Sequence, residues 1–136
     1  MDVDFSYRRR IYLSNTDAAG VLYFAEGMSI CHEAYEEWLQ TQGISLQTIL
    51  KEQKIALPIV HCQSDFLRPI FCSDLVEIQL KFTQVTEYKF AIAYSIFSVS
   101  SPPQLLVKAL THHVCIAPQT RSKIALPSEI KDLLKN

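Results

Sequence analysis

A single carboxylate, Asp17, stands in a setting that suits acyl-transfer chemistry. It follows a segment with the alternation of a β-strand and precedes a long segment with the apolar period of a helix. The first N–H groups of a helix have no partner within the helix, so they can stabilise a developing oxyanion. A base or nucleophile beside such donors is the minimum apparatus for acyl transfer. On spacing alone, a helix cap or a turn is the more common role for an aspartate at this place.

The histidines and cysteines form no comparable constellation. His112 and His113 are neighbours in an expected strand, so their side chains face opposite ways and do not act as a pair. His32 is expected on a helix surface or in packing. The cysteines contain no Cys-x-x-Cys pair and match no usual zinc pattern, which predicts reduced, mostly buried thiols and no metal site. They are Cys31, Cys62, Cys72 and Cys115.

The composition indicates a globular chain with one domain over residues 1–136. Apolar residues make up 49% and charged residues 20%, and the formal net charge of -1 argues against a nucleic-acid groove or a polybasic membrane patch. No apolar run reaches the ~18 residues that a membrane span needs, and the acidic N-terminus has no signal-peptide core. We therefore expect a cytoplasmic protein. Its glycines form neither a Gly-x-Gly-x-x-Gly nor a Walker pattern, which argues against a phosphate-binding loop.

The elements that must position Asp17 can be predicted from the spacing of apolar residues. Strands are expected at 5–13, 56–66, 75–83, 90–99 and 105–117, with short helices at 45–53 and 128–134. Arg9 interrupts the apolar face of the first strand. One long helix is expected over 22–42, with an apolar stripe of Phe24, Met28, Cys31, Tyr35, Trp38 and Leu39. Consecutive strands on short connections favour an antiparallel sheet, so we expect an α+β fold in which a curved sheet covers this helix.

Several segments resemble known thioesterases. The run TDAAGVLYF at residues 16–24 is similar to the signature of hotdog-fold acyl-CoA thioesterases of the 4-hydroxybenzoyl-CoA thioesterase type. The expected order of elements fits that fold over about residues 4–117. Segments 31–39, 56–61 and 111–117 resemble the 1,4-dihydroxy-2-naphthoyl-CoA hydrolases, which act in phylloquinone (vitamin K1) synthesis. The resemblance implies the hotdog fold, an antiparallel five-stranded sheet wrapped around one long central helix.

The resemblance also implies roles for residues of the first segment. Asp17 would be the catalytic carboxylate, acting either as nucleophile or as general base toward water. Backbone N–H groups near Tyr23 and Phe24 would polarise the thioester carbonyl. Gly20 would let the chain turn tightly without a side chain against the acyl group. Many relatives carry a histidine at the position of Phe24, so any acid–base or binding role of that histidine is missing here.

Substrate contacts and assembly follow from the same resemblance. His61 and Phe66 are predicted to line the acyl pocket. Arg68 and Lys89 are predicted to meet the nucleotide end of CoA, although each also fits an ordinary surface charge. The family forms dimers with a shared sheet and active sites at the subunit interface, often paired into tetramers. We therefore expect a homodimer or homotetramer that binds an acyl-CoA and needs no cofactor.

Two other functions stay open at this point. The chain fits a thioesterase for another aromatic or short-chain acyl-CoA, or a non-catalytic acyl-CoA-binding module of the same fold. Hotdog dehydratases are disfavoured, because their Asp-x-x-x-x-His pattern would need a histidine where this chain has Leu22.

Overall fold

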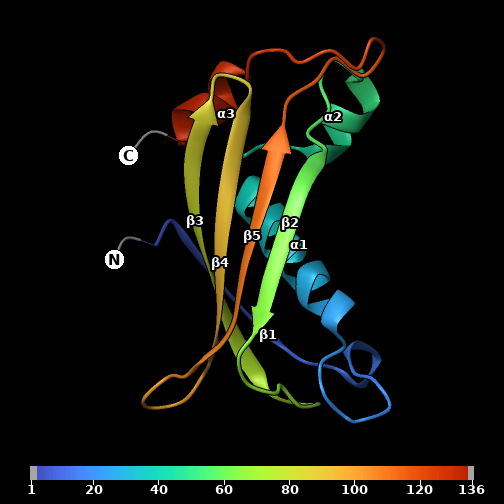
Figure 1. The fold of residues 1–136 in the computed structure, drawn as a ribbon. Coiled ribbons are helices and arrows are strands. Elements are labelled where there is room, and N and C mark those ends of the chain that lie inside the picture. The colour runs from blue at the N-terminus through green and yellow to red at the C-terminus, as the bar shows by residue number, and fades with distance from the viewer. Residues whose placement is uncertain (1–2, 135–136) are drawn as a thin grey trace.

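The computed structural model describes residues 3–134. Over that range, five strands form one antiparallel sheet in the order β1-β3-β4-β5-β2. Helix α1 runs along one face of this sheet, while α2 and α3 lie near one end (Figure 1). No helix in that range is both long and apolar enough to cross a membrane. This arrangement confirms the expected α+β fold. The elements are β1 (Phe5–Arg10), η1 (Leu13–Asn15), α1 (Phe24–Thr41), α2 (Leu46–Glu52), β2 (Ile59–Phe66), β3 (Leu75–Thr86), β4 (Lys89–Ser98), β5 (Leu105–Val114) and α3 (Ser128–Leu133).

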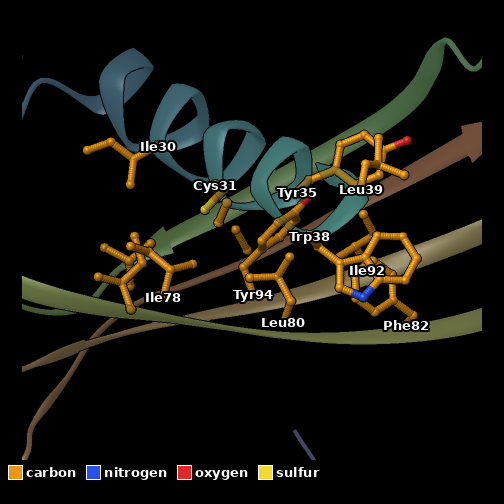
Figure 2. Close-up of a cluster of buried hydrophobic side chains, with 14 of the residues drawn as sticks. Ile30, Cys31, Tyr35, Trp38, Leu39, Ile78, Leu80, Phe82, Ile92 and Tyr94 are labelled. Atoms are coloured by element: carbon orange, nitrogen blue, oxygen red, sulfur yellow. The ribbon is translucent and has the colours of Figure 1, made fainter. Parts of the chain in front are cut away.

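Helix α1 buries one face against the sheet, as its apolar period predicts. Its side chains face inward-pointing residues of β3 and β4 (Figure 2). The indole of Trp38 stacks on Phe82 with ring centroids 3.9 Å apart, which anchors the C-terminal half of the helix. Phe24 departs from the prediction, because it opens the helix at 63% exposure and lies outside this core. The buried helix residues are Gly27, Ile30, Cys31, Ala34, Tyr35, Trp38 and Leu39.

Strand β1 is shorter than predicted. It ends at Arg10, because the chain turns there into the short 3-10 helix η1. Leu13, expected on the apolar face of the strand, lies in η1 and is 77% exposed. Within β1 the side chains alternate, and Arg9 occupies an inward position. Arg9 therefore points to the helix side of the sheet, where it pairs with Glu33 of α1.

Strand β2 forms one edge of the sheet. It precedes β3 in the chain but pairs only with β5, so the connection 67–74 carries the chain past the intervening strands. All but one of its side chains are exposed. Within the described chain, its outer backbone groups have no strand beside them (Figure 1). An open edge of this kind is a place where another strand can add.

The histidines and cysteines separate into buried and exposed sets. His113 points into the core at 0% exposure, while His112 points to the outer face of the sheet, as strand alternation predicts. Burial raises the pKa of the Cys31 thiol to about 12. Cys31 and Cys115 are buried, but the other two cysteines are exposed, so the expectation of mostly buried thiols is only half met.

Candidate active site

Asp17 begins a tight loop that its own backbone closes. The Asp17 N–H donates to the Val21 carbonyl at 3.0 Å, and the Gly20 N–H donates to the Asp17 carbonyl at 3.0 Å. The side-chain Oδ1 accepts a hydrogen bond from the Ala19 N–H at 2.8 Å, so Asp17 does serve the turn. Its Oδ2 accepts no hydrogen bond from residues 3–134, and the side chain is exposed. One carboxylate oxygen is therefore left for chemistry.

Gly20 is required for its backbone conformation. Its φ of 81° lies in the left-handed region, which residues with a Cβ rarely adopt. A Cβ at Gly20 would meet no atom within 4 Å, so no neighbouring group crowds the position. The predicted tight turn is confirmed, while the predicted clearance for an acyl group stays a prediction.

The N–H groups at the start of α1 differ in their partners. The Tyr23 N–H donates to the Asn15 carbonyl at 3.0 Å, so this donor is occupied and its predicted role at the substrate is corrected. Tyr23 is the N-cap of α1. The next two N–H groups, of Phe24 and Ala25, have no acceptor within the described chain, as expected for the first turn of a helix. Phe24 remains a predicted oxyanion donor, and Ala25 joins it.

A cavity of about 310 Å³ opens beside the Asp17 loop and the start of α1. Its two charged side chains belong to Asp17 and Arg68. Two aromatic rings, Phe24 and Phe66, stay 63% and 45% exposed, so both are accessible to a ligand. The structure thus brings four of the predicted site residues together. The apolar lining comprises Val21, Leu22, Phe24, Phe66, Leu67, Pro69, Ile70 and Val107.

Two predicted contacts lie elsewhere in the chain. His61 pairs in register with His112 on the outer face of the sheet, and the two rings meet edge to face with centroids 5.3 Å apart. Lys89 begins β4, whereas the cavity residue Val107 lies opposite the far end of that strand. Burial and then the charge of Lys89 hold the pKa of His112 below its ordinary value. His61 and Lys89 therefore lie away from Asp17 of the same chain, because strand alternation and strand length carry them there. Their contact with a substrate bound between two chains stays a prediction.

The sequence prediction missed one polar residue at this site. Asn15 is 8% exposed, and its side chain contacts both Arg9 and Glu26. Its carbonyl also holds the Tyr23 N–H. No motif marks such an asparagine. The one available signal was Arg9, whose charge interrupts an apolar strand face and therefore needs a polar partner inside the fold.

The family of the chain follows from the sequence taken as a whole. The model of the thioesterase-like superfamily matches residues 11–134, which include the Asp17 loop, α1 and strands β2 to β5. This chain belongs to that superfamily. The 1,4-dihydroxy-2-naphthoyl-CoA hydrolase of Crocosphaera subtropica is 46% identical to it over 131 residues, 96% of each chain. The hydrolase of the same name from Picosynechococcus sp. is 47% identical over 135 residues, covering 97% of this chain and 92% of the relative.

The similarity extends to three dimensions. The crystal structure of a 1,4-dihydroxy-2-naphthoyl-CoA thioesterase from Synechocystis matches this fold with a TM-score of 0.92 at 43% sequence identity. The match covers 96% of this chain and 94% of that one. The hotdog thioesterase family implied by residues 16–24 is thereby confirmed, and with it the expected class of enzyme, a thioester hydrolase.

Proposed function

We propose that this protein hydrolyses the thioester of 1,4-dihydroxy-2-naphthoyl-CoA to 1,4-dihydroxy-2-naphthoate and CoA, as a step of phylloquinone synthesis. The observation that carries the proposal is the Asp17 carboxylate beside a cavity with two exposed aromatic rings. A flat bicyclic acyl group suits this lining, because aromatic rings stack on one another. Relatives that are 46% and 47% identical to this chain carry the name of that hydrolase, which supports the choice of substrate.

In this proposal Asp17 acts on the thioester carbonyl, either by attacking it or by activating a water molecule. The Ala19 N–H holds Oδ1, which favours Oδ2 as the reacting atom. As the tetrahedral intermediate forms, its oxyanion accepts hydrogen bonds from the Phe24 and Ala25 N–H groups. Collapse of the intermediate breaks the carbon–sulfur bond. CoA leaves as a thiolate, which needs little acid assistance.

Arg68 is proposed to bind the CoA part of the substrate. It is the cation that lines the cavity, and its side chain is exposed. A guanidinium presents several N–H donors that match phosphate oxygens, so it suits the nucleotide end of CoA. Arg68 then sets the orientation in which the acyl group enters the apolar lining.

The site is proposed to be completed by a second copy of the chain. Strand β2 leaves an open edge on which Val60 is 57% exposed. The cavity residues Phe66 and Leu67, at the end of this strand, are also exposed. An open strand edge with exposed apolar side chains at both of its ends favours burial against a partner. We propose a homodimer that pairs two β2 strands, with each cavity at the interface, or a homotetramer of two such dimers.

We place the enzyme in the cytoplasm. Cys62 and Cys72 are exposed free thiols, which suit a reducing compartment. A proposed substrate that is itself a CoA thioester fits the same location.

A free-thiol assay over a panel of acyl-CoAs tests the function. The purified protein is incubated with 1,4-dihydroxy-2-naphthoyl-CoA, benzoyl-CoA and aliphatic acyl-CoAs, and the release of CoA is followed. We expect the largest kcat/KM for the bicyclic substrate. A preference for benzoyl or aliphatic groups would reassign the protein to another acyl-CoA. Tight binding of every acyl-CoA without release of thiol would indicate a non-catalytic binding module.

A further inference from the structure

Asn15 occupies the point where β1, the Asp17 loop and α1 meet. Its Oδ1 accepts hydrogen bonds from Nη2 of Arg9 at 2.7 Å and from the Tyr12 N–H at 2.9 Å. Its Nδ2 donates to Oε1 of Glu26 at 2.8 Å. Its carbonyl accepts from the Tyr23 N–H at 3.0 Å. Asn15 is therefore a buried polar residue whose side-chain oxygen and nitrogen both have hydrogen-bond partners, as buried polar groups generally do.

Arg9 extends this network along α1. Its side chain is 14% exposed, and its Nη1 donates to Oε1 of Glu33 at 2.8 Å. Oε2 of Glu33 accepts from the Tyr7 hydroxyl at 2.6 Å, and burial together with this hydrogen bond raises the pKa of Tyr7 to about 12. Tyr7 therefore stays protonated at neutral pH and remains a donor. Strand β1 is thus tied to α1 at two levels, directly at Glu33 and through Asn15 at Glu26.

The Asp17 loop depends on anchors at its two ends. At one end the Leu22 N–H donates to the Ile70 carbonyl at 2.7 Å. At the other end, the anchor is Asn15 with its hydrogen bonds to Arg9 and Glu26. Between these anchors, the backbone hydrogen bonds of Asp17 stay within the loop. Asp17 follows Asn15 by two residues, and Phe24 directly follows the N-cap whose N–H Asn15 holds. A shift of Asn15 therefore moves the carboxylate and the oxyanion donor relative to each other.

We propose that Asn15 is a positioning residue for thioester hydrolysis, holding the Asp17 carboxylate and the Phe24 N–H in register through its bonds to Arg9, Glu26 and the N-cap of α1. The inference rests on the proposed function. Displacement of a reacting group by about 1 Å costs up to about 10²-fold in rate. Asn15 does not line the cavity, so its loss lowers kcat with little effect on KM.

A reciprocal pair of substitutions tests this role. Asn15→Asp keeps the acceptors for Arg9 and the Tyr12 N–H but sets a second carboxylate against Glu26. Glu26→Gln then supplies a side-chain amide that donates to the new carboxylate. We expect Asn15→Asp to lower kcat about 10–100-fold with KM changed less than about 2-fold. The double variant should return kcat to within about 3-fold of the wild-type value.

The matched control is Arg8→Met. Arg8 lies on the same strand as Arg9 but on the opposite face of the sheet, where it pairs with Glu77 at 2.9 Å. This variant should keep the wild-type kcat. Circular dichroism melts show that each variant is assayed well below its unfolding transition. A folded Asn15→Asp variant with the wild-type kcat overturns the inference, and so does a loss of kcat that Glu26→Gln fails to recover.

Hydrogen exchange separates this inference from the proposed function. Asn15→Asp should speed the exchange of backbone amides over residues 15–24, and the added Glu26→Gln should slow it again. If the wild-type protein releases no thiol from any acyl-CoA, the proposed function fails. The hydrogen-exchange rates over residues 15–24 then decide by themselves whether Asn15 fixes the position of the Asp17 loop. Unchanged exchange in Asn15→Asp contradicts the positioning role whatever the activity.

Discussion

The ring of Phe66 lies directly against Gly27 of α1. A Cβ at Gly27 would come within 3.1 Å of Cε1 of Phe66 and 3.6 Å of Cδ2 of Leu22. Gly27 is therefore the helix position that lets the ring approach the backbone and form one wall of the cavity. This contact joins the end of β2 to the first turns of α1, and it sets one dimension of the proposed acyl site.

Gly27→Ala should reduce activity on a large acyl group more than on a small one. The new methyl displaces the Phe66 ring, which is 45% exposed and has room to shift toward the cavity. We expect kcat/KM for the bicyclic substrate to fall about 10-fold, since one methylene in a pocket is worth about 10–200-fold. Acetyl-CoA should be affected much less. Parallel kinetics on the two substrates measure the difference.

The control for this prediction is Gly27→Ala in a Phe66→Leu background. Without the aromatic ring, the alanine displaces nothing rigid, so the ratio of the two kcat/KM values should no longer change. Alanine is the better helix former by about 1 kcal/mol, so a general loss of fold is not expected. The same change of ratio in both backgrounds would show that Phe66 does not transmit the effect.

Asp17→Asn should lower turnover by about 10²–10⁴-fold, the usual contribution of a positioned base. The amide neither attacks the thioester nor takes a proton from water. Its oxygen can still accept from the Ala19 N–H, so the loop keeps its turn. The release of CoA measures turnover, and circular dichroism reports the fold. Near-normal turnover in a folded Asp17→Asn enzyme would remove Asp17 from the mechanism.

Single turnover in ¹⁸O-labelled water separates the two roles of Asp17. Attack by the carboxylate forms a mixed anhydride, and water that attacks this anhydride at Cγ of Asp17 places label in the Asp17 side chain. Direct attack by activated water places label only in the released acid. Label in the peptide that contains Asp17, measured by mass spectrometry, therefore indicates the anhydride path.

Phe24→Pro should remove one oxyanion donor without breaking α1. Phe24 is the first helical residue, where proline is tolerated. Tyr23 before it has φ -69° and ψ 135°, the extended conformation that a following proline requires. We expect kcat to fall about 10²–10³-fold, the usual cost of losing one such donor. The kinetics are compared on the bicyclic substrate.

Phe24→Leu is the matched variant, because it removes the ring but keeps the N–H. It should weaken binding and leave most of kcat. An equal kcat in the proline and leucine variants would show that this N–H does not stabilise the transition state.

His113 should make the fold sensitive to acid. Burial, and after it the charge of His32, lower the pKa of His113 from 6.5 to about 4. Between these values the unfolded chain binds a proton that the folded chain does not, so stability is full above pH 6.5 and falls as the pH drops toward 4. The loss from this group is about 3 kcal/mol. Urea unfolding at about pH 7.5, 5.5 and 4.5 measures it.

His113→Phe provides the comparison. The new ring can keep the stacking on Phe90, where the centroids now lie 4.7 Å apart at an interplanar angle of 5°. The variant loses the hydrogen bond between His113 Nε2 and Thr111, which lowers its stability by a similar amount at every pH. Its free energy of unfolding should therefore fall less steeply with acid than that of the wild type. Parallel curves would exclude His113 as the source of acid sensitivity.

Side-chain periodicity in the sequence was sufficient to predict the elements around the site. Helix α1 lies within the expected range 22–42, and β3 begins at Leu75 as the alternation of that segment indicates. Periodicity succeeds because the direction of a side chain follows from the backbone geometry of its immediate neighbours. It was less informative about strand ends. Strand β1 stops at Arg10 because the chain turns into η1 after it, and the spacing of apolar residues does not predict that turn.

The sequence by itself determined the helix, the strands and the turn in which Asp17 stands, and the resemblance of residues 16–24 determined the family. Only the tertiary structure decided the strand order, which brings Phe66 and Arg68 to Asp17 and leaves His61 on another face. It also decided that Asn15 occupies the Tyr23 N–H. The physical reason is the separation along the chain over which each kind of interaction acts. Periodicity reflects neighbours a few residues apart, whereas strand pairing, cavity walls and buried hydrogen bonds join side chains and backbone groups that the chain itself keeps apart.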